Sequence, residues 1–227
     1  MPTYEGKAAV FDLDGTLVDT LPDLWRVTNA VLAEEGLAPL AREQVRRMIG
    51  DGVRRLVERA FAAAGRPLAD GELDRLHRRF LDLYEADPHR DSRLPEGVVE
   101  ALVALRDDGF RLAVCTNKPQ RPSLAILEAF DLARHFALVV GGDVLPVRKP
   151  DPGPLRHVLA RLGVAPARAV MVGDSRNDRL TARAAGVPCV LLAEGYGEHR
   201  AEELAPEAVV TGFAEVPAAV RRLVDGD

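Results

Sequence analysis

Short apolar runs alternate with amphipathic segments along most of this 227-residue chain. The runs occupy residues 7–11, 110–115, 137–140, 169–172, 187–192 and 208–210, and segments with helical periodicity occupy residues 96–108, 123–130, 153–162, 178–185 and 216–224. Strands that alternate with helices in this way are typical of a parallel sheet with helices on both faces. The alternation therefore predicts an α/β fold built on a doubly wound, mainly parallel sheet.

One region interrupts this alternation. Between residues 20 and 87 the sequence contains amphipathic helical patterns but no convincing strand. Two apolar stripes at helical spacing stand out, formed by Val53, Leu56, Val57, Ala60, Phe61 and Ala64, and by Leu73, Leu76, Phe80 and Tyr84. Asp87-Pro88 is typical of a linker that returns the chain to the sheet. We therefore expect an all-helical cap domain of residues 20–87, inserted into a Rossmann-like catalytic core of residues 1–19 and 88–227.

The composition narrows the classes of function. No apolar run approaches the roughly 20 residues that a membrane helix needs, and the N-terminus lacks the pattern of an export signal. A formal charge of -5 argues against broad binding to the phosphate backbone of nucleic acids. Two cysteines, Cys115 and Cys189, are too few for a disulfide framework and fit a reducing compartment. We expect a cytoplasmic protein, a monomer or a homodimer, with no nucleic-acid or membrane partner.

Polar clusters follow the first four predicted strands. They are Asp12 and Asp14 after the first, Thr116, Asn117 and Lys118 after the second, Arg148 and Lys149 after the third, and residues 173–178 after the fourth. Ligands of open parallel sheets bind outside the carboxyl ends of the strands. The clusters are weak signals one by one, but together they predict a single site at that edge of the sheet.

The acids of these clusters indicate a metal. Asp12, Asp14, Asp174 and Asp178 would converge at one edge, where like charges are costly without compensation. A set of oxygen ligands without histidine or thiolate, beside an expected phosphate group, favours Mg²⁺. The alternative is that the acids are ordinary turn residues and helix caps.

The same edge offers a hydroxyl and cations for phosphate. Thr116 and Lys149 would be able to bind the oxygens of a phosphoryl group, and Lys149 supplies a point charge. The alternative is that Lys149 is a solvated surface lysine. The adjacent Pro150 argues against this alternative, because a proline restricts the loop. For Lys118 the solvated position and a role in the site are equal alternatives.

Together these residues resemble the four motifs of the haloacid dehalogenase superfamily. Asp12-Leu13-Asp14-Gly15-Thr16 is similar to the first motif, the strand ending in Thr116 to the second, Lys149-Pro150 to the third, and Gly173-Asp174 with Asp178 to the fourth. The order and spacing match over nearly the whole chain. The predicted cap also lies where one subclass of that superfamily carries a helical cap.

The resemblance implies catalytic roles for four residues. Asp12 would attack phosphorus and form an aspartyl-phosphate. Asp14 would protonate the leaving alkoxide and later deprotonate the attacking water. Thr116 and Lys149 would offset charge on the transferring group. Dehalogenases of the superfamily lack an aspartate at the position of Asp14, so its presence favours phosphoryl transfer over dehalogenation.

The resemblance also implies how ligands are held. The Asp12 carboxylate, the Asp14 backbone carbonyl and Asp174 would bind Mg²⁺, and Asp178 would support these ligands. Around the phosphate ester we expect Gly15, Thr16, Asn117 and Lys118 to complete the core side of the substrate site.

Several longer phrases resemble bacterial phosphoglycolate phosphatases. They are FDLDGTLVDT, IGDGVRRLVERA, TNKP, GGD, RKPDPGPL and VGDSRNDRLTARAAG. Within the predicted cap, Gly50 and Gly52 precede a helix that begins near Val53, where free N–H groups are able to meet an anion. With Arg54 or Arg55 they would bind the distal carboxylate of phosphoglycolate. The alternative is a tight turn between helices whose arginines face solvent.

The resemblance therefore implies a Mg²⁺-dependent phosphatase of small phosphate monoesters, with 2-phosphoglycolate as the expected substrate and glycolate and phosphate as products. A sugar-phosphate phosphatase, a pyrophosphatase or a phosphomutase of the same superfamily would keep Asp12 and Asp14 and differ in the cap. A module that only binds a phosphorylated ligand ranks last, because the catalytic residues are all present. Arg148 and Asp151 stand where relatives often have lysine and histidine, which bears on substrate choice.

Overall fold

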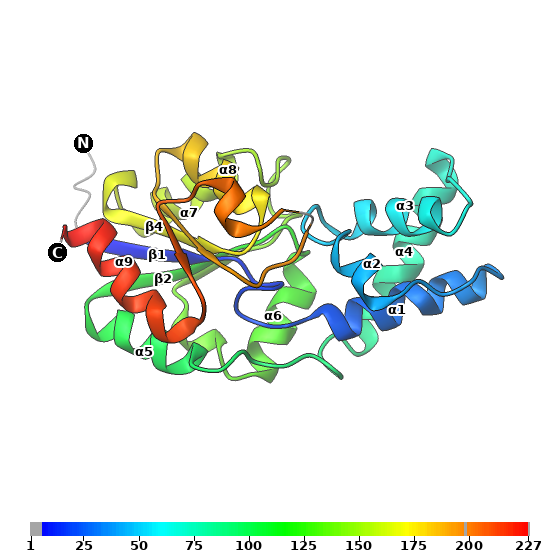
Figure 1. The fold of residues 1–227 in the computed structure, drawn as a ribbon, viewed down its shortest axis with the longest axis horizontal. Helices are drawn as coiled ribbons and strands as arrows, with labels where there is room; N and C mark the ends of the chain where they lie inside the picture. Colours follow the sequence, from blue (N-terminus) through cyan, green and yellow to red (C-terminus); the bar gives the residue numbers. More distant parts are fainter. Residues whose placement is uncertain (1–5, 198, 227) are drawn as a thin grey trace.

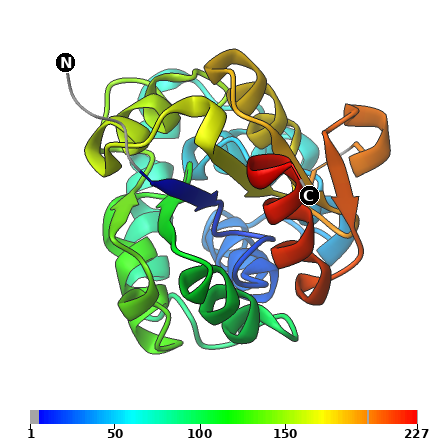
Figure 2. The same cartoon turned by 90° about the vertical axis from the view of Figure 1, so that its left-hand side faces the viewer.

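A six-stranded parallel sheet forms the centre of the larger lobe in a computed structural model that describes residues 6–197 and 199–226 (Figure 1). The strands are β1 (Lys7–Phe11), β2 (Phe110–Cys115), β3 (Leu138–Val140), β4 (Ala169–Gly173), β5 (Cys189–Leu192) and β6 (Ala208–Val210). They lie in the order β3-β2-β1-β4-β5-β6, and every neighbouring pair is parallel. Helices cover both faces (Figure 2), which confirms the predicted α/β class and doubly wound sheet.

The alternation of side chains along the strands builds a core on each face of the sheet. In β1, Ala9 and Phe11 belong to one apolar core, Ala8 and Val10 belong to the other, and all four are buried. The first core is covered by α5 (Val98–Asp107), α6 (Gln120–Ala129) and α9 (Val216–Asp225), and the second by α7 (Gly153–Leu162) and α8 (Arg176–Ala185). Strands buried on both faces are continuous apolar runs, which is why the sequence reveals them.

The helix starts differ most from the sequence prediction. α6 begins at Gln120 and α8 at Arg176, in each case before the predicted residue. The hydroxyl of Ser175 accepts a hydrogen bond from the backbone N–H of Asp178 at 3.4 Å, so Ser175 is the N-cap residue of α8. Short 3-10 turns also occur at Ala133–His135, Pro166–Arg168, Ala201–Leu204 and Phe213–Glu215.

The regular secondary structure of the second lobe, in its described residues, is helical. It contains α1 (Leu21–Glu34), α2 (Arg42–Arg46), α3 (Val53–Ala63) and α4 (Asp70–Ala86) (Figure 1). Leu56 and Phe61 of α3 are buried in the same apolar core as Leu76 and Phe80 of α4. These are residues of the two stripes seen in the sequence. The bounds of the cap domain, residues 20–87, stay a prediction.

The chain crosses between the lobes at two segments that pair with each other. The Asp19 N–H donates to the Arg93 carbonyl at 2.9 Å, and the Arg93 N–H donates to the Asp19 carbonyl at 3.1 Å. Just before Arg93, the chain that returns to the core contacts α1. There the buried carboxylate of Asp23 accepts a hydrogen bond from the Ser92 hydroxyl at 2.7 Å. Asp91 and Ser92 therefore still contact α1 immediately before the chain reaches this pair.

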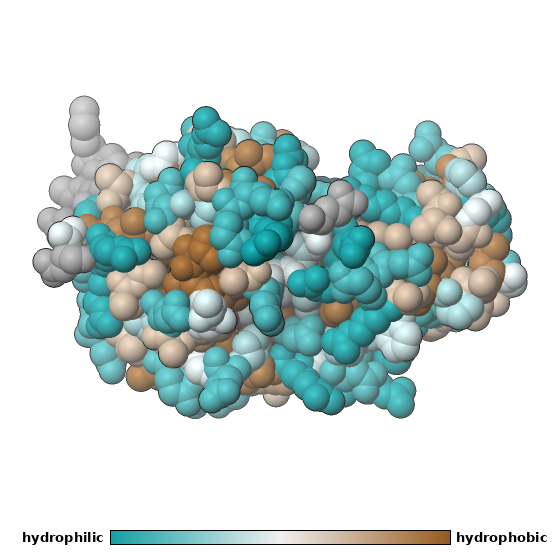
Figure 3. All heavy atoms as spheres, viewed as in Figure 1, coloured by the Kyte–Doolittle hydropathy of each residue, from teal (hydrophilic) through white to brown (hydrophobic). Residues whose placement is uncertain are grey.

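The surface is polar along the boundary between the lobes. Hydrophilic residues border much of this boundary on the face drawn in Figure 3. Within the described part of the chain, none of the helices combines the length and the apolar character that crossing a bilayer requires.

Candidate active site

The carboxyl ends of β1, β2 and β4 meet the cap at a small cavity. Its core side includes Asp12, Asp14, Thr116, Asn117, Lys118, Asp174, Ser175 and Tyr196, and its cap side consists of Leu24, Ile49, Gly50, Gly52, Val53 and Leu56. The cavity measures about 30 Å³, which is enough for about two water molecules. The cap is therefore closed over the site, and it has to move before a phosphate ester can bind.

Three carboxylates converge at the floor of this site. Oxygen atoms of Asp12, Asp174 and Asp178 lie within 4.8 Å of one another, and all three residues are buried. The oxygens of Asp178 are occupied, because they accept from the Lys149 ammonium at 2.5 Å and from the Ser175 hydroxyl at 2.7 Å. Asp178 therefore fits the supporting role that the sequence predicts for it.

Lys149 neutralises part of this charge. Its Nζ atom lies 3.1 Å from Asp12 Oδ1 and 2.5 Å from Asp178 Oδ1, and the residue is 2% exposed. Burial by itself would lower the pKa of Lys149, but the carboxylates of Asp12 and Asp178 outweigh burial and raise it. Lys149 is thus a buried, permanently charged ammonium and not a solvated surface lysine.

Within residues 6–197 and 199–226, Asp12 forms an ion pair only with Lys149, and Asp174 forms none. Burial raises the pKa of Asp12 to about 6, against the opposing effect of Lys149. Burial, followed by the charges of Asp178 and Asp12, raises the pKa of Asp174 well above its usual range. A divalent cation would relieve this repulsion, and an all-oxygen set of donors suits a hard ion such as Mg²⁺. Asp12 and Asp174 fit the role of its direct carboxylate ligands.

This charge arrangement predicts how metal-free protein responds to pH. A carboxyl whose pKa is raised on folding, from 3.8 to about 6 for Asp12, favours the folded state less as pH rises through that window. We expect the stabilisation of the protein by Mg²⁺ to be larger at pH 7 than at pH 5, because protons compete with the cation for Asp12. Differential scanning calorimetry with chelator or with saturating Mg²⁺ measures this, and equal stabilisation at both pH values would contradict it.

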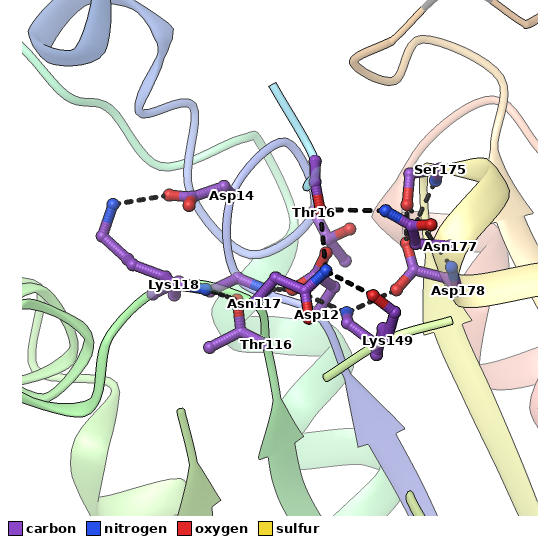
Figure 4. Close-up of polar contacts among 12 residues, drawn as sticks. Asp12, Asp14, Thr16, Thr116, Asn117, Lys118, Lys149, Ser175, Asn177 and Asp178 are labelled. Carbon is purple, nitrogen blue, oxygen red and sulfur yellow. Dashed lines mark hydrogen bonds and ion pairs between the residues drawn. The ribbon is translucent and has the colours of Figure 1, made fainter. Parts of the chain in front are cut away.

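Asp14 lies apart from the three converging carboxylates. Its Oδ1 atom accepts from the Thr20 hydroxyl at 2.6 Å and from the Lys118 ammonium at 2.9 Å. Figure 4 shows this carboxylate directed toward Lys118 and away from Asp12. Because Thr20 immediately precedes α1, the side chain of Asp14 is held at the point where the chain enters the cap.

Gly15 and Thr16 support Asp174 and do not line the cavity. Gly15 has φ +80, and a Cβ atom there would lie 2.5 Å from Asp174 Oδ2, so only glycine fits. The Thr16 hydroxyl donates to Asp174 Oδ1 at 2.6 Å. The structure thus places these two residues beside a predicted metal ligand, whereas the sequence assigns them to the substrate.

Two asparagines of the core hold the cap turn that contains Gly50. The side-chain amide of Asn117 donates to the Gly50 carbonyl at 2.9 Å and to the Lys149 carbonyl at 2.9 Å. The amide of Asn177 donates to the same Gly50 carbonyl at 3.0 Å and to Asp51 at 2.7 Å. Asn117 therefore links the cap to the loop that contains Lys149. The contact of Asn177 with the cap is one that the sequence does not reveal.

Arg54 and Arg55 are not brought into the cavity, in contrast to the sequence prediction. The guanidinium of Arg54 lies 3.0 Å from Asp74, and that of Arg55 lies 2.5 Å from Glu58. Their side chains are 37% and 60% exposed. Gly50 and Gly52 do line the cavity. At the start of α3 the backbone faces the core, whereas the side chains of these arginines do not.

Two tyrosines join the site without a clear sequence signal. Tyr84 is the last residue of an apolar stripe on α4, but its hydroxyl accepts from the Lys118 ammonium at 2.7 Å. The backbone N–H of Tyr196 donates to Asp174 Oδ2 at 2.7 Å, and its hydroxyl donates to Asp19 at 2.5 Å. Tyr196 thus connects a predicted metal ligand to the segment that leads into the cap.

Known proteins share this chain's sequence and fold. Residues 9–192 match the family described as Haloacid dehalogenase-like hydrolase. A phosphoglycolate phosphatase of Caulobacter vibrioides is 47% identical over 214 residues, which cover 94% of this chain and 90% of that protein. One from Rhodospirillum rubrum is 48% identical, with coverage of 92% and 89%. The crystal structure of a predicted phosphoglycolate phosphatase from Haemophilus somnus superimposes with a TM-score of 0.87 at 35% identity, covering 93% of this chain and 96% of that one.

These similarities extend over the sheet and the cap alike. The matched region runs from β1 to the end of β5, so it includes Asp12, Thr116 and Asp174, which directly follow their strands, and Lys149 in the loop after β3. At 47% and 48% identity over most of this chain, the two phosphoglycolate phosphatases are similar enough to establish a shared family. This chain therefore belongs to the haloacid dehalogenase-like hydrolase family.

Proposed function

We propose that this protein is a Mg²⁺-dependent phosphatase that hydrolyses 2-phosphoglycolate to glycolate and phosphate. The observation that carries the proposal is the buried centre of Asp12, Lys149 and Asp174 beneath a closed cap. Such a centre, once a divalent cation is bound, suits the charge of a phosphoryl group. The names of relatives that match most of the chain support the same substrate.

In the first step, a carboxylate oxygen of Asp12 attacks phosphorus and an aspartyl-phosphate forms. The bond between phosphorus and the ester oxygen breaks, and the leaving glycolate oxygen takes a proton from Asp14. Asp14 has to turn from Thr20 and Lys118 toward the leaving group before it can act as this acid, because its carboxylate is held by those two residues.

In the second step, a water molecule attacks the phosphorus of the aspartyl-phosphate. Asp14, now ionised, accepts a proton from that water, the bond to Asp12 breaks, and inorganic phosphate leaves. The carboxylate of Asp12 and the proton on Asp14 are then both restored. The closed cap excludes other water, so that only an ordered molecule reaches phosphorus.

The metal and the core cations would stabilise the charge of both steps. When bound, Mg²⁺ supplies Lewis acidity and orients the phosphoryl oxygens. Asp12 and Asp174 would hold it, together with the Asp14 backbone carbonyl that the family pattern implies. Thr116 lines the cavity and Lys149 contacts Asp12, so both are placed to offset charge on the transferring group.

We also propose that the protein acts in the cytoplasm. The thiols of Cys115 and Cys189 are both free and buried, as expected of a protein that needs no disulfide. A monomer or a homodimer stays our prediction for the assembly.

The substrate is tested by a comparison of phosphate esters. We expect kcat/KM for 2-phosphoglycolate to exceed that for ethyl phosphate, p-nitrophenyl phosphate and sugar phosphates by at least about tenfold, because ethyl phosphate lacks the carboxylate and the larger esters have less room beneath the cap. Activity should disappear with chelator and return with Mg²⁺. A sugar phosphate or pyrophosphate that is hydrolysed better would overturn the substrate assignment but leave the phosphatase chemistry in place.

A further inference from the structure

Lys118 is the only cationic side chain among the described residues that line the cavity. We propose that its ammonium binds the carboxylate of the substrate, and that Tyr84 of the cap positions this ammonium. The inference rests on the proposed function, because it explains how a phosphatase of this family would prefer an ester that carries a carboxylate. It assigns a specificity role to Lys118 and a positioning role to Tyr84.

The ammonium of Lys118 has one hydrogen-bond donor left for a ligand. Its Nζ atom donates to Asp14 Oδ1 at 2.9 Å and to the Tyr84 hydroxyl at 2.7 Å. It also lies 4.3 Å from the centroid of the Tyr84 ring. An ammonium carries three donors, so one remains after these two bonds. Because Lys118 lines the cavity, a carboxylate bound there would accept that third hydrogen bond.

Three other cations near the site have partners of their own. Lys149 lies between Asp12 and Asp178, where the phosphoryl group and the metal require it. Arg54 and Arg55 contact acids outside the cavity. The cap side of the cavity presents only apolar side chains and backbone, which give an anion little compensation for its lost hydration.

Tyr84 brings the cap into this recognition. The residue is fully buried on α4 and stacks on Phe80, so a phenylalanine would satisfy its apolar surroundings. The hydroxyl has a separate contact, since it accepts the hydrogen bond from Lys118. The cap must be closed for this bond to form, and closure therefore orients Lys118 toward the carboxylate.

The decisive measurement compares two esters that differ in one group. 2-Phosphoglycolate carries a carboxylate where ethyl phosphate carries a methyl group, so the ratio of their kcat/KM values reports carboxylate recognition alone. We expect Lys118→Met to reduce this ratio by about 10- to 100-fold, which is the range of a charge-assisted hydrogen bond. Tyr84→Phe should reduce it by about tenfold, mainly through KM for 2-phosphoglycolate, and leave ethyl phosphate unaffected.

Lys118→Met will also disturb Asp14, so turnover of both esters is expected to fall. Binding of 3-phosphonopropionate and propylphosphonate in the presence of Mg²⁺, measured by calorimetry, avoids this problem because neither phosphonate is hydrolysed. We expect wild-type protein to prefer the carboxylate compound and Lys118→Met to lose the preference. Lys118→Arg, which retains a cation, should recover part of it.

Arg121→Gln is the matched control. Arg121 is a core cation that pairs at 3.1 Å with Glu85, next to Tyr84 on the same cap helix, but its side chain is 82% exposed. The ratio should not change in this variant. A wild-type ratio near one would overturn the proposed substrate, whereas a large ratio that survives in Lys118→Met would overturn only this inference. Equal losses for both esters in Tyr84→Phe would remove the positioning role of Tyr84.

Discussion

Asp12→Asn will lower kcat for phosphate release by about four orders of magnitude or more and leave the fold intact. The amide cannot attack phosphorus, and the loss of a nucleophile has effects of that size in other hydrolases. The substitution retains an oxygen that can accept the bonds now made to Asp12 Oδ1 by the Leu13 N–H at 2.7 Å and by Lys149 at 3.1 Å. Steady-state phosphate release and thermal unfolding of the same preparation measure the two expectations.

The controls for this variant are chemical and structural. Mass spectrometry excludes deamidation back to aspartate, which would restore activity. Asp108→Asn removes a carboxylate that pairs with Arg221 on the core surface, and it should leave kcat unchanged. Retention of more than a few per cent of the wild-type kcat in Asp12→Asn would remove the nucleophile assignment.

Lys149→Met will destabilise the metal-free protein by about 3–5 kcal/mol at pH 7, because it leaves buried carboxylates without their cation. Both partners are buried, and Lys149 contacts each of them directly. We expect kcat to fall as well, by about 10²- to 10³-fold, because a positive charge beside the transferring group is lost. Urea unfolding with chelator, and turnover with Mg²⁺, measure the two effects.

The pH dependence separates charge from packing in this variant. At pH 5 a proton on Asp12 replaces part of the missing charge, since burial already raises the pKa of this carboxyl to about 6. The destabilisation should therefore be smaller at pH 5 than at pH 7, whereas a packing defect would be the same at both. Lys7→Met is the control, because Lys7 forms a partly exposed pair with Asp225 and should contribute less than about 1 kcal/mol. An unfolding free energy that does not change in Lys149→Met would contradict the role of this ion cluster.

The sheet and the chemical centre are the parts that follow from sequence. Strands buried on both faces are mostly apolar, and β1 and β2 have the predicted bounds. Polar residues that end parallel strands must meet at one edge, which brings Asp12, Thr116 and Asp174 together in the structure. Both inferences depend only on the local chain pattern and on the topology that it implies.

The contacts between cap and core do not follow from sequence in this way. Tyr84 falls in an apolar stripe, and helical periodicity correctly places its ring in the interior. Periodicity does not report what the hydroxyl meets, and only the packing of α4 against the core brings it to Lys118. The same limit explains Arg54 and Arg55, which are two and three residues from Gly52 but turn toward Asp74 and Glu58.

For this protein, the sequence by itself determined the α/β class, the helical insertion and the acids and lysine of the centre. Each of these depends on the pattern of residues within a short stretch of chain. The tertiary structure decided which side chains meet at the cavity between cap and core, because those contacts join residues distant in sequence. Lys118 and Tyr84 are the clearest pair, since their hydrogen bond joins the loop after β2 to helix α4 of the cap. Asp14 is another, because its carboxylate is held by Thr20 and Lys118 and not by its neighbours in the first motif.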